Sequence, residues 1–221
     1  MTDYRQELDR ALAFTGAGHE LPARARADQL IRIATRYLGE PATLDALDVG
    51  CGIGLTDREF RGRLGSLAGT DVSEAALETA ARENPDVRYV RAERDRLPFE
   101  DGTFDFVFAS SVVQIVPSAD RPRFVSELAR VTRPGGLAVV VEHNPYNPAT
   151  RLVVRRFRSD EPIVMLPARE TKRLLSSNGL VPVESGFFLL APSRGTRLLW
   201  VERRLRRLPL AAQYYVAARN P

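Results

Sequence analysis

Three glycines and two aspartates have the types and spacing that first suggest chemistry. The glycines alternate after an apolar run, at Gly50, Gly52 and Gly54. Asp48 precedes them, and Asp71 follows Asp48 by 23 residues. Glycine accepts positive φ and lets a ligand lie directly on the backbone, because it has no Cβ atom. An acidic residue about 20 positions past such a turn is where a β-α-β nucleotide site holds a ribose diol. The spacing therefore predicts a ligand-binding site at this turn.

Hydrophobic patterning predicts the elements that position these residues. Residues 44–49 predict a buried parallel strand, residues 50–54 a tight turn, and residues 55–63 a helix leading to the strand before Asp71. Later strands are expected at residues 87–91, 104–109, 137–142, 181–190 and 213–218. Helices are expected at residues 4–14, 23–38, 74–83, 120–132 and 168–177, and a basic helix at 196–208.

Four stretches in chain order carry a family resemblance, namely residues 48–54, 69–73, 97–105 and 128–136. They resemble the successive motifs of class I S-adenosylmethionine-dependent methyltransferases, and the nearest likeness is to the small-molecule, ubiquinone/menaquinone-type branch. The resemblance implies an α/β, Rossmann-like fold with a seven-stranded, mostly parallel sheet in the order 3-2-1-4-5-7-6. It further implies an antiparallel last strand, helices on both faces and an N-terminal helical lid.

By this resemblance the cofactor is S-adenosyl-L-methionine, and the residues implied to bind it are Asp48, Gly50, Cys51, Gly52, Asp71, Val72, Glu93, Arg94 and Ser110. Arg94 departs from the family pattern, which usually has a small residue against the adenine. Cys51 is expected to pack beneath the ligand, since nothing nearby would lower its pKa enough for a nucleophile. Arg24, on the helix before the first strand, is a candidate partner of the methionine carboxylate.

The substrate side is expected at the loop after the fifth strand, because ligands of open α/β sheets bind at the carboxyl ends of strands. His143 is the candidate catalytic residue, as a base for an acceptor hydroxyl or carboxyl. A pocket contact or a purely structural role are its alternatives. Asn144 and Tyr146 share this loop, and Gln114 stands where many relatives have histidine.

The segment before the first strand is expected to form the lid. In this family such helices generally cover the cofactor, which makes Gly16 and Gly18 hinge candidates. His19 either lines the pocket or is a surface loop histidine. The chain is thus expected to form one methyltransferase domain, with the lid at residues 1–43, the cofactor-binding core at 44–143 and a substrate-side, sheet-closing part at 144–221.

Composition narrows the function classes. The 221 residues contain one cysteine and two histidines, so an intrachain disulfide is impossible and no metal-ligand spacing exists. The start of the chain lacks a signal-peptide pattern, and no run of about 18 apolar residues occurs. We therefore expect a cytoplasmic protein with no bound metal and no stable membrane insertion. Nothing in the sequence indicates an oligomeric state.

Charge is unevenly distributed along the chain. Residues 1–149 hold 18 arginines against 23 acidic residues, whereas residues 150–221 hold 14 basic against 5 acidic residues. The basic part is either a solvated face or a surface for an anionic substrate, nucleic acid or a membrane. The expected helix at 196–208 either packs over the pocket or docks on a membrane surface. Nucleic acid is disfavoured as a substrate because no added RNA-binding module is present.

The resemblance to class I methyltransferases implies S-adenosylmethionine-dependent methyl transfer to an O, N or C atom of a small-molecule metabolite. Two alternatives stay open. The first is an enzyme of the same fold that uses the cofactor for a non-methylating reaction such as cyclisation. The second is a non-catalytic cofactor-binding protein.

Overall fold

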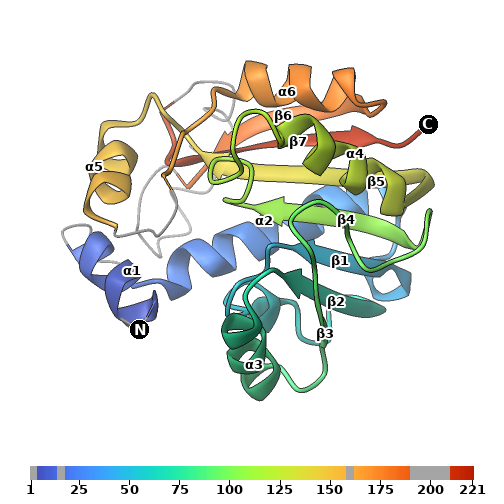
Figure 1. The fold of residues 1–221 in the computed structure, drawn as a ribbon, viewed down its shortest axis with the longest axis horizontal. Coiled ribbons are helices and arrows are strands. Elements are labelled where there is room, and N and C mark those ends of the chain that lie inside the picture. The colour runs from blue at the N-terminus through green and yellow to red at the C-terminus, as the bar shows by residue number, and fades with distance from the viewer. Residues whose placement is uncertain (1–3, 14–17, 158–161, 190–209) are drawn as a thin grey trace.

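The computed structural model describes residues 4–13, 18–157, 162–189 and 210–221 (Figure 1). One seven-stranded sheet has the order β3-β2-β1-β4-β5-β7-β6, which confirms the expected order. Its strands are β1 (Asp45–Val49), β2 (Ser66–Asp71), β3 (Arg88–Arg91), β4 (Phe104–Ser110), β5 (Thr132–His143), β6 (Val181–Phe188) and β7 (Gln213–Arg219). Neighbours from β3 to β5 pair in parallel, and β7 is antiparallel to both β5 and β6.

Helices cover both faces of the sheet, as expected, with α4 and α6 on one face and α2 on the other (Figure 1). The α-helices are α1 (Tyr4–Leu12), α2 (Glu20–Leu38), α3 (Glu74–Glu83), α4 (Arg121–Val131), α5 (Pro148–Arg156) and α6 (Ala168–Ser177). Two short 3₁₀ turns are η2 (Pro41–Thr43) and η3 (Asp57–Phe60). None of the described helices is both long and apolar enough to span a membrane.

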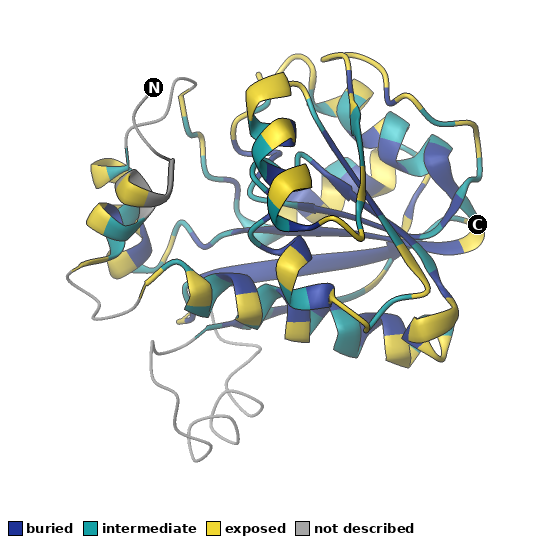
Figure 2. Ribbon diagram, turned by 90° about the horizontal axis from the view of Figure 1, so that it is seen from below, coloured by how far each residue is buried: buried dark blue, intermediate teal, exposed yellow. Residues whose placement is uncertain are grey.

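Burial explains why the central strands are almost wholly apolar. Phe106 and Phe108 of β4 pack with α2, whereas Val107 and Ala109 face the opposite cluster beneath α4, and all four side chains are fully buried. A strand covered on both faces loses the alternation of a half-exposed strand. Figure 2 shows this arrangement as dark strands between helices whose outer faces are exposed.

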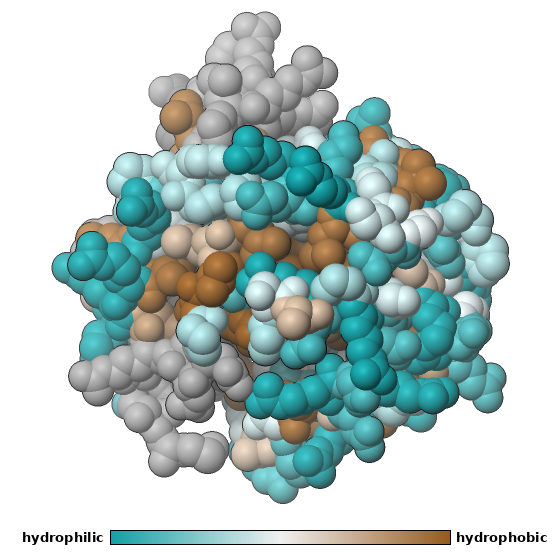
Figure 3. Space-filling view, turned by 45° about the horizontal axis from the view of Figure 1, so that its top comes forward, coloured by the Kyte–Doolittle hydropathy of each residue, from teal (hydrophilic) through white to brown (hydrophobic). Residues whose placement is uncertain are grey.

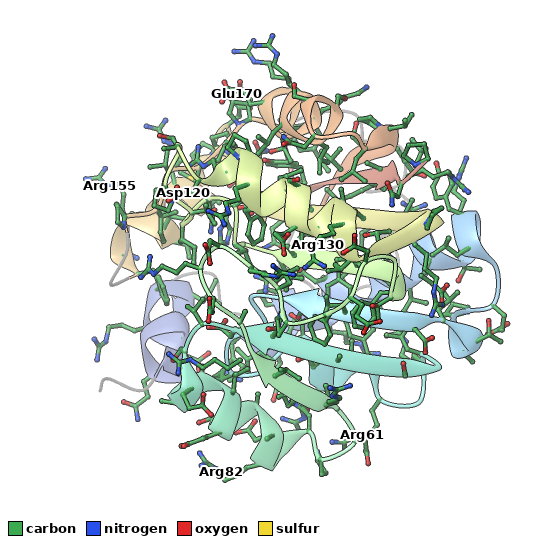
Figure 4. All side chains as sticks on the ribbon, turned by 45° about the vertical axis from the view of Figure 1, so that its right-hand side comes forward. Arg61, Arg82, Asp120, Arg130, Arg155 and Glu170 are labelled. Carbon is green, nitrogen blue, oxygen red and sulfur yellow. The ribbon has the colours of Figure 1, made fainter. Side chains whose placement is uncertain are left out.

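The motif at residues 97–105 holds the sheet together. Arg130 of α4 donates to the carbonyls of Leu97 (3.0 Å) and Phe99 (2.7 Å) and is labelled in Figure 4. Asp105 accepts from the backbone N–H of Asp45 at 2.9 Å and from the guanidinium of Arg133 at 2.7 Å. These contacts link the motif to β1, α4 and the start of β5 and give Asp105 a structural role.

The expected helix at residues 55–63 is wrong, because only the single turn η3 forms there. Gly54 and Gly62 both have positive φ, at 73° and 69°, and so bound the segment. The side chains of Asp57 and Phe60 fix it from inside, since they are only 1% and 2% exposed. A right-handed helix needs negative φ, so Gly54 and Gly62 limit the helical segment to the residues between them.

Other boundaries shift slightly. β5 begins at Thr132 instead of Leu137, because the segment after α4 already pairs with β4 through a register shift at Phe104 and Phe106. The basic helix expected at 196–208 and the hinge candidate Gly16 lie outside the described residues. The division of the chain into lid, core and substrate-side part stays a prediction.

Candidate functional site

The glycine turn follows β1 at the carboxyl edge of the sheet. Gly50, Gly52 and Gly54 all have positive φ, at 75°, 55° and 73°. The backbone N–H of Gly50 donates to the carbonyl of Thr70 at 2.7 Å, which fixes the turn to β2. A Cβ atom on Gly50 would lie 2.5 Å from a methyl carbon of Val112, but one on Gly52 would meet nothing within 4 Å. The backbone at Gly52 therefore borders open space that a ligand can occupy.

Asp71 lies directly against this turn. One carboxylate oxygen accepts from the backbone N–H of Gly52 at 2.9 Å, and the other accepts from that of Ser73 at 2.9 Å. Each oxygen has a second lone-pair site, so the carboxylate can still accept from a diol. Val72 beside it is 46% exposed and offers an apolar surface. The turn and the acidic residue that the spacing predicted are thus in contact.

A pair of carboxyl groups lies behind the turn, and of the two only Asp48 was predicted as a site residue. Asp48 and Asp57 are 3% and 1% exposed, and their side chains hydrogen-bond to each other. The hydroxyl of Tyr89 donates to Oδ2 of Asp57 at 2.8 Å. Burial, followed by the charge of Asp57, raises the pKa of Asp48 well above its ordinary value. Burial also raises the pKa of Asp57 to about 6. Two buried carboxyl groups this close disfavour the state in which both are charged.

Cys51 occupies the same turn without reactive character. Its thiol is half-buried, and burial raises its pKa far above the ordinary value, with the charges of nearby Asp48 and Asp57 acting in the same direction. A thiol that stays protonated is a poor nucleophile. This environment agrees with a packing role beneath a ligand.

The ends of β4 and β5 form the other side of the site. Ser111, just after β4, has φ 63° and donates its backbone N–H to the carbonyl of Val141 at 2.7 Å. Glu142 is fully buried, and one of its oxygens accepts from the backbone N–H of Val113 at 2.8 Å. Burial raises the pKa of Glu142 to about 8. Sequence reasoning passed over this residue, although a glutamate in the last position of an apolar run was a signal.

His143 is half-buried, and its Nδ1 lies 2.9 Å and 3.0 Å from the two side-chain amide atoms of Gln114. Burial, and then the positive charge of Arg26, lower the pKa of His143 to about 3. The imidazole is therefore neutral at physiological pH and has little affinity for a proton. An imidazole of ordinary pKa could act as a base, but this environment argues against that role for His143. It favours a contact with the bound ligand, shared with Gln114.

Helix α2 contributes a cation that sequence reasoning missed. Arg26 donates from Nε to the side-chain oxygen of Gln213 at 3.2 Å, and its charge acts on Asp48, Glu142 and His143. Arg24 is exposed two positions earlier on the same helix. A shift of two positions on a helix turns a side chain by roughly 200°, so only one of the two can face the sheet.

The predicted lid and loop residues have mixed outcomes. His19 donates from Nδ1 to a carboxylate oxygen of Asp9 of α1 at 2.8 Å, which joins α1 to the start of α2. Asn144 is fully buried, donating to the carbonyl of Ala211 at 2.8 Å and accepting from the backbone N–H of Tyr146 at 3.0 Å. The first bond joins the loop after β5 to Ala211 and the second lies within that loop, so Asn144 has a structural role. Its substrate-side role stays a prediction. Tyr146 is 56% exposed.

Unpaired polar atoms gather along this edge. Six buried side-chain atoms have no hydrogen-bond partner among the described residues. Four of them belong to the ends of β1, β4 and β5, on Asp48, Ser110, Ser111 and Glu142. The other two, on Asp57 and Asn84, lie behind the turn. Buried polar groups are normally satisfied, so such a group of exceptions indicates a ligand site.

The sequence of this edge matches a known family model. Residues 47–140, from the middle of β1 into β5, match the model described as "Methyltransferase domain". They are a class I methyltransferase domain.

Proteins with this domain support the assignment. An uncharacterized chloroplastic methyltransferase of Arabidopsis thaliana is 30% identical over 71% of this chain and 48% of its own length. A malonyl-[acyl-carrier protein] O-methyltransferase of Serratia marcescens is 31% identical over 60% of this chain and 51% of its own length. The chain spans about half the length of the curated relatives it matches.

Solved structures share the fold of this methyltransferase domain. Geranyl diphosphate C-methyltransferase of Streptomyces coelicolor, in complex with S-adenosyl-L-homocysteine, aligns with a TM-score of 0.62 at 19% identity and covers 88% of this chain and 77% of its own. The [4+2]-cyclase SpnF aligns with a TM-score of 0.62 at 19% identity and covers 88% of this chain and 81% of its own. Both likenesses concern the fold alone.

The cofactor of the methyltransferase domain is S-adenosyl-L-methionine, and the residues present fit it. The open backbone at Gly52 leaves room for the ligand, and the Asp71 carboxylate lies beside that space to accept from a ribose diol. Among the described residues, no group of three or more His, Cys, Asp or Glu side chains could hold a metal. The individual cofactor contacts, including those of Glu93 and Arg94, stay predictions. Both of these side chains are exposed after β3.

Proposed function

We propose that the chain transfers the methyl group of S-adenosyl-L-methionine to an O, N or C atom of a small-molecule metabolite. The observation that carries this proposal is the convergence of the open backbone at Gly52, the Asp71 carboxylate and the unpaired polar atoms at the ends of β4 and β5 on one edge of the sheet. When bound, the cofactor supplies an electrophilic methyl group on a sulfonium.

The chain's own contribution is alignment. Asp71 and the turn hold one reactant, and the segment after β4, with Gln114 and His143, borders the other. Fixing two reactants in line is worth about 7–11 kcal/mol of the barrier in well-oriented systems. Neither residue has to exchange a proton for this, which suits the neutral imidazole of His143.

The border of the acceptor side is partly apolar. Ile115 and Val164 are 36% and 55% exposed, and the backbone N–H of Val164 donates to the carbonyl of Gln114 at 2.8 Å, which brings the two segments together. Figure 3 shows hydrophobic side chains gathered in a band on the face it views, bordered by hydrophilic ones. We therefore favour a small molecule with an apolar portion as acceptor. We do not propose nucleic acid as a partner. The low cysteine content supports the proposal of a cytoplasmic location.

A non-methylating reaction is the second candidate, because the fold also supports a cyclase. Such an enzyme would use the same turn to bind its cofactor, so its cofactor residues would not differ. A non-catalytic cofactor-binding protein is the third candidate.

One experiment separates the three. The purified chain is incubated with S-adenosyl-L-methionine labelled on its methyl group and with a metabolite extract, and products are analysed by mass spectrometry. Methyl transfer predicts a labelled product heavier than its substrate by one CH₂ group, with release of S-adenosylhomocysteine. A product of unchanged mass without that release would support cyclisation. Tight cofactor binding without any turnover would support the binding protein.

A further inference from the structure

The pair formed by Asp48 and Asp57 is not explained by alignment of reactants. Asp48 is the last residue but one of β1, beside the glycine turn, and Asp57 begins η3, nine residues later. Each has one oxygen with no partner among the described residues. Tyr89 holds the other oxygen of Asp57 at 2.8 Å. A protein that needed only to fix the turn could use neutral side chains here, because buried charge is costly.

The charges around the pair are unbalanced. Arg26 from α2 is a cation acting on Asp48, whereas Asp71 from β2 adds a third carboxyl group. Tyr89 from β3 and the Cys51 thiol in the turn complete the titratable surroundings, and burial raises the pKa of both groups, so they stay neutral. Three acidic groups facing one arginine leave a negative site even when one proton is shared.

We propose that Asp48 and Asp57 hold one shared proton in the ligand-free protein and release it when a primary ammonium group binds at Asp48. This inference rests on the proposed function, since the ammonium group would be the α-amino group of the cofactor, held over the glycine turn. The proton passes to solvent, the ammonium keeps its own protons, and its N–H groups donate to the carboxylate that has become charged. Asp57 acts through Asp48 and is a positioning residue.

The proposal predicts a proton-linked affinity. Above the pKa of about 6 that burial gives Asp57, the free pair holds a single proton. Binding that releases one proton tightens about tenfold for each unit by which pH rises in this range. Asp57→Asn keeps a hydrogen-bonding partner for Asp48 but cannot exchange the proton.

The experiment is calorimetric titration with S-adenosylhomocysteine between about pH 6 and about pH 8, in buffers of different ionisation enthalpy, which counts the protons released. Wild-type protein is expected to release close to one proton and to bind more tightly as pH rises. The ligand 5′-methylthioadenosine keeps the adenosine and lacks the amino acid, so it should bind with no release and no pH dependence.

Substitutions test whether the released proton comes from the pair formed by Asp48 and Asp57. S-adenosylhomocysteine binding to Asp57→Asn should release fewer protons than binding to wild type and should depend less on pH, because the charge of Asp57 no longer raises the pKa of Asp48. Asp86→Asn, at a carboxyl whose side chain is 77% exposed, should behave like wild type. Proton release in Asp57→Asn equal to that in wild type would overturn the proposal.

The wild-type measurements decide the matter even if Asp57→Asn does not fold. Binding of S-adenosylhomocysteine with no proton release and constant affinity would overturn the shared-proton proposal and leave the proposed function intact. Proton release of equal size with 5′-methylthioadenosine would also overturn it, because the amino group would not be the cause. Failure of both ligands to bind would overturn the proposed function and this inference together.

Discussion

Two sides of the same sheet edge each bury a carboxyl group near a strand end, and their surroundings differ. On the β1 side, Asp48 faces two further carboxyl groups, Asp57 and Asp71. On the β5 side, Glu142 instead accepts from the backbone N–H of Val113. Arg26 acts on both sides. One edge of the sheet can therefore hold two different sites. The acidic β1 side suits a cation, and the nearly neutral β5 side suits an uncharged reacting atom.

The β1 side should respond most strongly to loss of Asp71. Asp71→Ala removes the acceptor for the Gly52 and Ser73 backbone N–H groups as well as the proposed ribose contact. We expect S-adenosylhomocysteine affinity to fall about 10²-fold, since hydrogen bonds to a charged group are worth about 1.5–3 kcal/mol each. Calorimetry measures the change, with the exposed Asp86→Ala as control. Unchanged affinity would remove Asp71 from the site.

Substitution of two glycines tests whether the ligand binds at the turn. Gly52 and Gly62 both have positive φ, at 55° and 69°, and a Cβ atom on either would meet nothing within 4 Å. Gly52→Ala and Gly62→Ala should therefore lose similar stability, about 1–2 kcal/mol each. Only Gly52→Ala should also lose cofactor affinity, about tenfold or more, because its methyl group enters the ligand space. Equal cofactor affinity in both variants would place the ligand elsewhere.

On the β5 side, substitution of His143 should affect turnover and spare cofactor affinity. A neutral imidazole that contacts Gln114 can be replaced by another hydrogen-bonding group. His143→Gln should therefore keep kcat within about tenfold of wild type, while His143→Ala should lose more. Turnover is measured once an acceptor is known. A loss of about 10²-fold or more in the glutamine variant would restore the base role.

The stability of the folded protein should also depend on pH through Glu142. Burial raises the pKa of Glu142 to about 8, so the folded protein holds a proton that the unfolded chain has already lost above its ordinary value of 4.5. Stability from this group is therefore lost as pH rises between those two values, by at most about 1.4 kcal/mol per pH unit. Glu142→Gln should flatten this decline. Denaturant unfolding at several pH values measures it, and parallel curves for the two proteins would disprove the shift.

The β1 side and the β5 side of the site also differ in how much of each can be predicted from the sequence. The strand–turn–strand around Gly50 and Asp71 is local, because hydrophobic period and glycine spacing encode it directly. The strand order was available only through family resemblance. Asp57, Arg26 and Glu142 could not be assigned, because their roles depend on contacts between separate elements and on burial. The expected helix after Gly54 failed for the same reason, since the buried Asp57 side chain fixes a single turn there.

His143 shows the same limit at one residue. Its position at a strand end suggested a base of ordinary pKa, and that position was correct. Its proton affinity depends on the half-buried ring and on a cation from a helix more than 100 residues earlier in the chain, both of which lower the pKa to about 3. Position along a strand is readable from sequence, whereas electrostatic environment comes from the assembled fold.

A crystal structure of the protein with S-adenosylhomocysteine tests the central claim most directly. We expect the ribose hydroxyls within hydrogen-bond distance of the Asp71 carboxylate, the amino acid portion over the backbone of Gly52, and its ammonium group beside Asp48. The sulfur should face the ends of β4 and β5. Ligand density away from the glycine turn, or a ribose out of reach of Asp71, would contradict this placement of the cofactor.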